Sequence, residues 1–231
     1  MGKTHEGEIM EQYPKIQTVF NRDPATNYKT VIDGDFSKPE FEYLKKNTWI
    51  FTEKVDGTNI RIIWDMERVR FAGKTDNAQI PAFLYDRLTE LFDKDLFLEK
   101  FSCPVCLYGE GYGAKIQKGG ENYKMGGVDF VLFDVLIDGW WLERKNFEEI
   151  AGSLGIKIVP IIGEGDLFDL KDLVLSGFNS RWGNFQAEGI VAKPKMELKA
   201  RNGERIITKL KHKDFIKEYR NAFHAFKEKL R

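Results

Sequence analysis

An Asp-Gly pair at positions 56 and 57 separates two strand-like segments in the stretch TEKVDGTNIR, residues 52–61. An apolar run, 49–51, precedes the pair, and the alternating apolar pattern of a half-buried strand follows it over 60–64. Asp-Gly between two such segments is a strong signal for a two-residue turn, because glycine accepts positive φ without steric cost. Local pattern alone therefore predicts a β-hairpin, with Lys54 beside its turn.

The other periodic segments follow in a mixed order rather than as a βαβ repeat, which favours an α+β fold with largely antiparallel sheets. Strand patterns cover 49–54, 58–65, 68–72, 105–109, 128–138, 156–162, 187–193 and 204–211, and helical patterns cover 80–93, 146–154, 169–178 and 213–230. Asn146 is expected to cap the second of these helices, and Gly155 to end it. Residues 1–48 are turn-rich and predict loops with a short strand or two. We expect one domain, 1–231, ending in an amphipathic helix, 213–230.

Composition excludes a disordered chain and a membrane-spanning one. The 231 residues are 42% hydrophobic and 13% aromatic, which is enough to build a proper core. No apolar run is long enough to cross a bilayer, and the start, MGKTHEGEIM, lacks the apolar region of a signal peptide. Glu6 also breaks the myristoylation pattern. These features predict a cytoplasmic protein without a membrane partner.

Charge is distributed unevenly, although the formal net charge is zero. The segment 193–231 contains 13 Lys or Arg and 5 Asp or Glu, a balance of +8, so the preceding residues carry −8. A basic segment attached to an acidic body indicates an anionic partner on one face. Zero net charge argues against a protein that coats nucleic acid indiscriminately.

The two cysteines, Cys103 and Cys106, form a single C-x-x-C pattern. Such a pair can be half of a zinc site, a redox pair or two ordinary thiols. There is no second cysteine pair, and the three histidines lie far away without ligand spacing. We therefore expect two ordinary thiols and no disulfide framework.

Two glycine patterns resemble nucleotide-binding loops, and both fail. The segment 73–75, GKT, matches the end of a P-loop, but the first glycine that the motif requires falls on Arg68. The segment 109–113, GEGYG, partly matches a dinucleotide fingerprint, but its third glycine is misplaced. The longer segment 109–127 predicts either a flexible surface loop or a loop that follows a nucleic-acid backbone. It combines seven glycines and two tyrosines with Lys115, Lys118 and Lys124.

A lysine nucleophile acting on a phosphoanhydride would need a specific set of partners. Free lysine has a pKa of about 10.4, so nearby cations or desolvation must lower that pKa before the amine reacts. The phosphates would need lysines and a divalent metal, the sugar would need carboxylates, and the base would need an aromatic face. Lys209 and Lys211, two apart on one predicted strand, point to the same face. Candidates at the ends of predicted strands are Glu110, Phe133, Asp134, Glu188, Lys209 and Lys211.

The ordered set KVDGTN, YGEGYG, FVLFDV, AEGIVAK and ITKLK resembles the five signature motifs of the covalent nucleotidyltransferases. This superfamily contains ATP-dependent DNA ligases, RNA ligases and mRNA capping enzymes. Each motif alone is weak, but five in the right order over about 160 residues form a strong signal. The chain is most similar to RNA ligases that seal nicks and ends in RNA duplexes, because Asn59 completes K-x-x-G-x-N where DNA ligases typically have arginine. The resemblance implies a nucleotidyltransferase fold of antiparallel sheets flanked by helices, with the nucleotide pocket between them.

The resemblance also implies a role for each matching residue. Lys54 would take AMP from ATP as a lysyl phosphoramidate, and the backbone at Glu53 and Val55 would hold adenine. Mg²⁺ or Mn²⁺ would assist. The other matches are Asn59 near the phosphates, Lys74 at a position usually occupied by arginine, Glu110 on the ribose hydroxyls, Phe133 stacked on adenine with Asp134 beside it, Glu188 on the divalent metal or its waters, and Lys209 and Lys211 on the α-phosphate.

The implied activity is ATP-dependent joining of RNA 3′-hydroxyl and 5′-phosphate ends through lysyl-AMP and a 5′-adenylylated RNA. One departure from the family concerns length: only about twenty residues follow Lys211, too few for the OB-fold domain of DNA ligases and capping enzymes. We expect the basic C-terminal segment and the lysines of 109–127 to contact RNA. It stays open whether a protein partner or a homodimer contributes to RNA binding.

Two rival functions stay open. An ATP-dependent DNA ligase or a capping-type nucleotidyltransferase fits the same motifs, but less well, because of Asn59 and the missing OB-fold domain. A non-catalytic module that binds nucleic-acid ends belongs to a different class. Retention of Lys54, the glutamates and the C-terminal lysine pair argues against that module.

Overall fold

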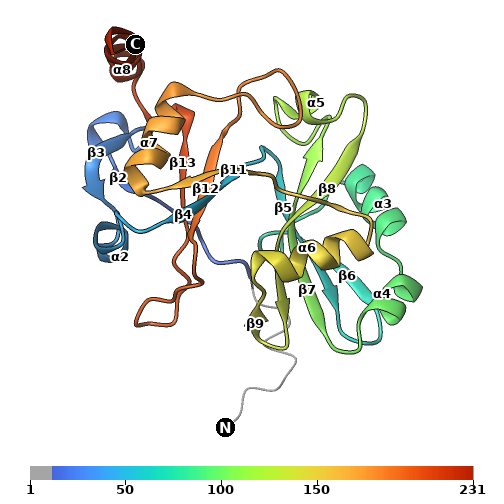
Figure 1. Cartoon of the computed structure of the whole chain (residues 1–231). Coiled ribbons are helices and arrows are strands. Elements are labelled where there is room, and N and C mark those ends of the chain that lie inside the picture. The colour runs from blue at the N-terminus through green and yellow to red at the C-terminus, as the bar shows by residue number, and fades with distance from the viewer. Residues whose placement is uncertain (1–11, 231) are drawn as a thin grey trace. The chain divides into compact units, whose positions relative to one another are not determined.

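The computed structural model describes residues 12–230 and divides the chain into two compact units. Unit 1 contains the described residues 12–13 and Asp56–Val159, and unit 2 contains Pro14–Val55 and the described residues from Pro160 onward (Figure 1). Each unit has its own sheet and its own hydrophobic core. The expectations drawn from MGKTHEGEIM lie outside the described residues. Within the described part of the chain, no helix is both long enough and apolar enough to cross a membrane.

Unit 1 is built on a six-stranded sheet in the order β10-β8-β7-β5-β6, with β9 paired to β8. Its strands are β5 (Thr58–Trp64), β6 (Val69–Ala72), β7 (Val105–Gly113), β8 (Val128–Ile137), β9 (Trp140–Trp141) and β10 (Lys157–Ile158). Its helices are α3 (Ala82–Leu91), α4 (Lys94–Lys100), α5 (Gly120–Tyr123) and α6 (Arg144–Ser153). All pairs in this sheet are antiparallel except β10 with β8.

The core of unit 1 lies between one face of this sheet and the helices α3, α4 and α6 (Figure 1). Strand β5 sends alternate residues to this core, as the period of two in a strand requires. The opposite face of β5 is left for polar residues. The main contributors to the core are Ile60, Ile62 and Trp64 of β5, Leu84 and Leu88 of α3, Phe97 of α4, and Phe147 and Ala151 of α6.

Unit 2 is built on a five-stranded sheet in the order β1-β13-β12-β4-β11, and a separate two-stranded sheet pairs β2 with β3. The strands are β1 (Gln17–Thr18), β2 (Phe20–Arg22), β3 (Val31–Phe36), β4 (Trp49–Glu53), β11 (Ile161–Gly165), β12 (Gly189–Pro194) and β13 (Thr208–Lys211). The helices are η1 (Pro24–Thr26), α2 (Pro39–Tyr43), α7 (Leu167–Ser176), η2 (His212–Asp214) and α8 (Lys217–Lys229).

Helix α7 covers the core of unit 2. Asp166 caps its first turn, and Asp169 returns a bond to the Asp166 backbone N–H, a reciprocal arrangement that satisfies two orphan donors. Gly177 follows the helix with a φ of +71°, a conformation that favours glycine. Four apolar side chains of α7 are buried against the sheet: Leu167, Leu170, Val174 and Leu175.

The predicted hairpin at 52–61 is wrong, because β4 and β5 belong to different sheets. Strand β4 pairs with β11 and β12 in unit 2, whereas β5 pairs with β6 and β7 in unit 1. Gly57 does not have positive φ, and a Cβ atom there would lie 2.3 Å from the carbonyl oxygen of Gly111 on β7. Close backbone approach, rather than a turn, therefore requires this glycine. The Asp-Gly pair marks the point where the chain passes from unit 2 into unit 1.

The single strand predicted over 156–162 is also wrong. Strand β10 pairs with β8 in unit 1, and β11 pairs with β4 in unit 2. Pro160 lies between the two strands, and proline cannot donate the hydrogen bond that a continuous central strand needs. Apolar periodicity is the same on both sides of the proline, so it could not separate the two sheets.

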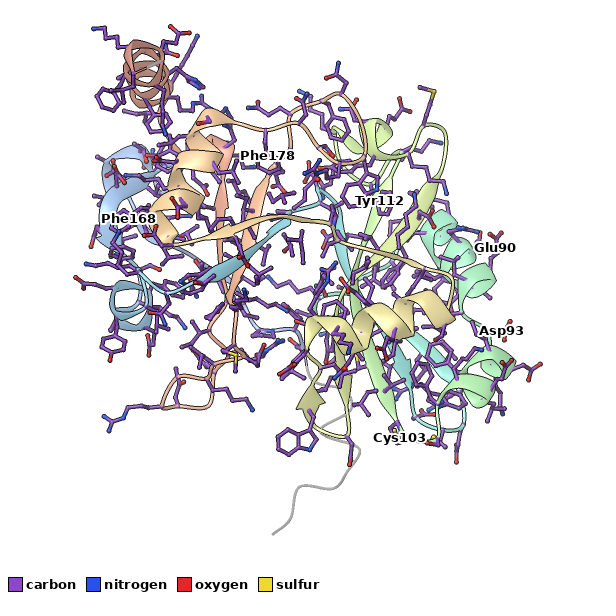
Figure 2. The ribbon with its side chains drawn as sticks, viewed as in Figure 1. Glu90, Asp93, Cys103, Tyr112, Phe168 and Phe178 are labelled. Carbon is purple, nitrogen blue, oxygen red and sulfur yellow. The ribbon has the colours of Figure 1, made fainter. Side chains whose placement is uncertain are left out.

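The α+β class and the largely antiparallel pairing are confirmed, with parallel pairs only at β1–β13 and β10–β8 among the described strands. Strand β7 continues to Gly113, so residues 109–113 are strand rather than loop, and Tyr112 is fully buried there (Figure 2). Helix α6 begins at Arg144, so the predicted cap at Asn146 is wrong. Gly155 follows that helix with positive φ, as expected.

The C-terminal helix predicted over 213–230 is observed as η2 followed by α8. Helix α4 was not predicted, because seven residues are too few for a clear helical period. Each unit is compact by itself. That the whole chain acts as one nucleotidyltransferase domain stays a prediction.

Candidate functional site

Lys54 follows the last residue of β4, and a neighbouring strand of unit 2 fixes its backbone. Its N–H donates to the carbonyl of Gly189, at the start of β12, over 2.9 Å. Its Nζ lies 2.7 Å from Oε2 of Glu188, and Nζ of Lys211 lies 2.5 Å from Oε1 of the same carboxylate. The side chain of Val55 is buried. Glu188 thus bridges the candidate nucleophile and one of the two lysines predicted to bind phosphate.

Strand register confirms that Lys209 and Lys211 share one face of unit 2. Lys209 lies opposite Val191 on β12, and Val191 lies opposite Thr52 on β4. Leu210, between the two lysines, and its register partner Ile190 on β12 point to the buried core on the other face. The face that carries the lysines is therefore the face to which Lys54 belongs by the same alternation.

The Glu188 carboxylate is held in its charged form by these lysines. Burial alone would raise the pKa of Glu188, but the charge of Lys54 and the hydrogen bonds from Lys211 and Lys54 bring that pKa below its usual value of 4.5. The opposing effects mean that the carboxylate remains ionised although it is mostly removed from water. Unit 2 therefore holds a charge-paired cluster of Lys54, Glu188 and Lys211.

Glu188 is also the residue predicted to hold a divalent metal. Among residues 12–230, no group of three His, Cys, Asp or Glu side chains is placed to hold a metal ion. Mg²⁺ is usually bound through one or two carboxylates plus substrate phosphates rather than by an all-protein cage. A single carboxylate therefore fits a metal that arrives with a triphosphate. Such a metal would compete with Lys54 and Lys211, which contact both oxygens of Glu188.

Glu53 precedes Lys54 but points to the opposite, buried face of β4. Its register partner on β12 is Ile190, a core residue, and the Glu53 side chain is 1% exposed. Its carboxylate accepts hydrogen bonds from Ser180 Oγ at 2.5 Å and from the Arg181 N–H at 2.8 Å. Burial raises the pKa of Glu53, against the lowering effect of Arg181 and Ser180. No sequence motif pointed to the segment that Glu53 holds.

In unit 1, the face of the sheet opposite the core carries a row of polar and aromatic side chains. Asn59 on β5 lies directly opposite Glu110 on β7. Arg61 lies opposite Tyr108, and Tyr108 lies opposite Asp134 on β8. Unit 1 thus brings two predicted site residues, Asn59 and Glu110, side by side, with Asp134 in the neighbouring row.

Asn59 offers an acceptor that nothing in the described chain uses. Its amide oxygen is buried and has no hydrogen-bond partner within residues 12–230. A buried acceptor without a donor is rare in folded proteins and calls for a water, ion or ligand. Asn59 is therefore suited to receive a hydrogen bond from a bound group.

Phe133 and Asp134 lie in an aromatic cluster that includes a residue the sequence did not reveal. The hydroxyl of Tyr13 donates to Oδ2 of Asp134 at 2.7 Å, and the Tyr13 ring packs edge-on against Phe133, with centroids 5.0 Å apart. Tyr108 and Trp141 complete the cluster. Asp134 is fully buried, whereas Phe133 is only partly covered. A lone tyrosine in a turn-rich segment carries no periodic signal, which is why it was missed.

Lys74 is exposed in the loop after β6, and a buried arginine holds that loop. Arg61 Nε donates to the carbonyl of Gly73 at 2.9 Å, and its Nη2 lies 2.6 Å from Oδ1 of Asp76. The hydrogen bond from Arg61, with a second from Gln12, lowers the pKa of Asp76. Arg61 was missed, because an arginine that alternates with isoleucines reads as a solvent-facing strand residue.

The three lysines of the glycine-rich segment do not behave alike. Lys115 and Lys118 are exposed and have no ion-pair partner in the described chain. Lys124 instead pairs with Asp129, with Nζ and Oδ2 2.9 Å apart. Lys115 and Lys118 are therefore the more available cations for an anionic partner.

The glycine-rich segment is attached to the Asp-Gly pair that follows Lys54. Gln117 Nε2 donates to the carbonyl of Gly57 at 3.1 Å, and the N–H of Asp56 donates to the hydroxyl of Tyr123 at 3.4 Å. All four residues belong to unit 1. The segment is thus fastened to the first residues of unit 1 rather than hanging as an independent loop.

The C-x-x-C pair forms neither a disulfide nor a metal site. Neither Cys103 nor Cys106 is in a disulfide, and Cys106 is buried on β7. Neither belongs to a metal-binding group among the described residues. That the two cysteines are ordinary thiols stays a prediction.

Comparison with known proteins places these motifs in a family. The RNA ligase family model matches residues 47–211. Among solved structures, the chain is similar to Naegleria gruberi RNA ligase with PPi (TM-score 0.61, 20% identity, 92% of this chain and 61% of that one). It is also similar to a lysine mutant of the same ligase with AMP and Mn (TM-score 0.61, 18% identity, 93% and 60%). The chain spans about 60% of the length of these ligases. Since the family match covers most of the chain, the protein belongs to the RNA ligase family.

Proposed function

We propose that this chain is an ATP-dependent RNA ligase that joins RNA 3′-hydroxyl and 5′-phosphate ends through lysyl-AMP and a 5′-adenylylated RNA. One observation carries the proposal: the carboxylate of Glu188 bridges Lys54 and Lys211. A lysine in a chance hairpin would be solvated. This one is partly buried, hydrogen-bonded to a strand, and paired beside a second cation.

The first step would be attack by the Lys54 amine on the α-phosphorus of ATP. An N–P bond forms, the bond to the β-phosphate oxygen breaks, and pyrophosphate leaves with its electron pair. The amine reacts only in its uncharged form, so Lys54 must release both its proton and its ion pair with Glu188. Lys209 and Lys211, on the same face of β13, would stabilise charge on the α-phosphate.

The remaining predicted residues fit complementary tasks in this proposal. In unit 1, Phe133 would stack on adenine beside Asp134, and Glu110 would accept hydrogen bonds from the ribose hydroxyls. The N–H₂ group of Asn59 would donate to the phosphates, and its unused acceptor oxygen would receive a hydrogen bond from a ligand hydroxyl or a metal-bound water. Lys74 would also contact the nucleotide. In unit 2, the backbone at Glu53 and Val55 would hold adenine. Together these roles correspond to a nucleotidyltransferase fold.

The cofactors of the proposed reaction are ATP and a divalent cation, Mg²⁺ or Mn²⁺. The Naegleria gruberi ligases were solved with AMP and Mn, with ATP and Mn, or with PPi, which supports the same choice here. Glu188 would hold the cation or its waters. When bound, the cation neutralises charge on the triphosphate. The protein's own part is to present the amine and to keep Lys209 and Lys211 fixed.

In the later steps AMP passes from Lys54 to the RNA 5′-phosphate, and the RNA 3′-hydroxyl then displaces AMP. The exposed Lys115 and Lys118 are our candidates for RNA phosphate contacts, together with the basic C-terminal segment. Lys124 is a weaker candidate, because Asp129 already neutralises it. A protein partner or a homodimer that completes RNA binding stays a prediction.

A second enzymatic reading, as an ATP-dependent DNA ligase or a capping-type nucleotidyltransferase, is favoured less, because the family match is to RNA ligases. The test compares nicked RNA with nicked DNA, and ATP with GTP as the source of the covalent adduct. RNA sealing with ATP supports the proposal, whereas DNA sealing or a GMP adduct would replace it.

The enzymatic class itself is tested by intact mass measurement after incubation with ATP and Mg²⁺ or Mn²⁺. We expect a gain of one AMP, lost in Lys54→Ala. Lys157→Ala is the matched control, because Lys157 is exposed on β10 and has no proposed role. An unmodified chain that never gains AMP with either metal would leave only a non-catalytic binding module.

A further inference from the structure

The segment between α7 and β12, residues 178–186, is a closed loop that no motif assigns (Phe178 is labelled in Figure 2). The Ser180 N–H donates to the carbonyl of Phe185 at 2.8 Å. Asn179 Nδ2 donates to Oδ1 of Asn184 at 3.0 Å. The loop is therefore cross-linked internally and has a defined conformation.

Glu53 fastens this loop to the strand that carries Lys54. Its carboxylate accepts from the hydroxyl of Ser180 and the N–H of Arg181, and the Trp182 N–H donates to the same Ser180 hydroxyl oxygen at 3.1 Å. The carboxylate thus holds Ser180 and Arg181 directly, and Trp182 through the Ser180 hydroxyl. We call the group of Glu53, Ser180, Arg181 and Trp182 the Glu53 clamp.

Holding a loop with a buried carboxylate carries a free-energy penalty. Removing its charge from water is unfavourable, and the raised pKa of Glu53 reflects that cost. The sheet does not need the clamp to place Glu188, because the Glu188 carbonyl already accepts the N–H of His212, and Lys54 already bonds to Gly189. We therefore expect the Glu53 clamp to position a side chain of the loop rather than Glu188.

The loop presents a cation. The Arg181 side chain is exposed and forms no salt bridge within residues 12–230, although its charge opposes the burial that raises the pKa of Glu53 and its backbone is fixed at that carboxylate. Trp182, next to it, is only partly covered. An arginine whose backbone is fixed can bind a phosphate, and an adjacent aromatic ring can stack on a base.

We propose that Arg181, mounted on the Glu53 clamp, contacts a phosphate of the RNA strand, with Trp182 against a neighbouring base or sugar. This inference rests on the proposed RNA ligase function. We assign RNA rather than the ATP triphosphate, because Glu53 and Lys54 point to opposite faces of β4. Arg181 is mounted on the Glu53 side, and the phosphate-binding lysines of β13 lie on the Lys54 side.

The test separates the two chemical steps in the whole chain. Lysyl-AMP formation is followed with ATP alone, and AMP transfer is then followed with a 5′-phosphorylated RNA at low concentration. In Arg181→Ala we expect the RNA step to fall about tenfold more than the ATP step, the loss expected for one charged hydrogen-bonded contact. The slope of log affinity for that RNA against log salt should decrease by about one.

Two further variants control the result. Lys29→Ala removes an exposed cation from the η1–β3 connection of the same unit, outside the basic C-terminal segment, and should match the unmodified chain in both steps. Ser180→Ala weakens the mount but leaves Arg181 in place, and should reduce the RNA step in the same direction by a smaller factor. Equal loss in both steps for Arg181→Ala would overturn the inference, because it would indicate an ATP contact or a folding defect.

Failure of the inference and failure of the proposed function are distinguishable. If the unmodified chain forms lysyl-AMP and Arg181→Ala transfers AMP to RNA as fast as Lys29→Ala does, only the role of Arg181 is lost. If the unmodified chain forms no lysyl-AMP, the proposed function is overturned, and the inference with it.

Discussion

The two units use the same design with opposite electrostatic results. Each presents one sheet face to an apolar core and the other face to motif residues. In unit 2 two of the motif lysines, Lys54 and Lys211, are paired with one carboxylate, that of Glu188. In unit 1 the amide oxygen of Asn59 is buried without a partner in the described chain, and Phe133 is only partly covered.

In the proposed function, this difference separates a reactive surface on unit 2 from a ligand-recognition surface on unit 1. A lysine paired with a carboxylate is protected until a ligand competes for that carboxylate, so unit 2 must be rearranged before it reacts. A buried acceptor without a donor is destabilising until a ligand supplies that donor. Ligand binding should therefore stabilise unit 1. Substitutions should therefore affect chemistry in unit 2 and affinity in unit 1.

The largest effect is expected at Glu188. Glu188→Gln keeps the shape of the side chain but removes the charge that pairs with Lys54 and Lys211 and would hold the cation. We expect the rate of lysyl-AMP formation to fall by about 100-fold or more, as when a charge-stabilising group is removed from an active site. Single-turnover labelling with ATP measures it, and a rate within a few-fold of the unmodified chain would show that unit 2 is not the reactive surface.

The lysines of β13 should come next. Lys209→Ala and Lys211→Ala should each slow lysyl-AMP formation by at least about tenfold, because each removes a charged contact to the α-phosphate. Lys213→Ala, an exposed lysine two residues further on, is the matched control. If all three variants behave alike, the lysines act as a diffuse positive field, and the assignment of a specific face fails.

A substitution on the motif face of unit 1 should weaken ATP binding without lowering the stability of the fold. Asn59→Ala is expected to weaken ATP binding by about tenfold, while the thermal midpoint stays the same or rises, because an unsatisfied buried acceptor is removed. Calorimetric titration and thermal unfolding of the same preparation give both values. A lowered midpoint with unchanged ATP affinity would make Asn59 a structural residue and would remove the contrast between the units.

The smallest effects concern pH and sharpen the comparison within unit 2. Glu188 has a pKa below 4.5 in the fold, so its contribution to stability is present above that pH and is lost as pH falls through the folded value. Glu53 has a pKa above 4.5, so its contribution is present at low pH and is lost as pH rises through its folded value.

The two glutamine variants should therefore show opposite pH trends in thermal midpoint. Glu188→Gln should be less stable than the unmodified chain near neutral pH, and the difference should vanish in acid. The difference between Glu53→Gln and the unmodified chain should move in favour of the variant as pH rises above 4.5. Parallel trends for the two variants would contradict the assigned environments.

The sequence predicted those parts of the site that depend on strand alternation and on motif order. The shared face of Lys209 and Lys211 follows from their spacing, and the family follows from five short motifs. It could not predict which sheet a strand joins, because β4 and β5 have similar patterns but different partners. The hairpin error at the Asp-Gly pair is the direct result.

Supporting residues escaped prediction for a related reason. Tyr13, Arg61 and Ser180 act through single hydrogen bonds to residues far away in sequence, at Asp134, at Gly73 and Asp76, and at Glu53. Such contacts leave no period or spacing. They become visible only when the fold brings the partners together.

In the proposed reaction, the Lys54 amine that pairs with Glu188 is the group that accepts AMP. Peptide mapping of the protein after reaction with ATP and a divalent cation tests it most directly. We expect AMP on Lys54 alone, through an acid-labile phosphorus–nitrogen bond. AMP attached to any other residue, or a labelled chain whose Lys54 peptide is unmodified, would contradict it.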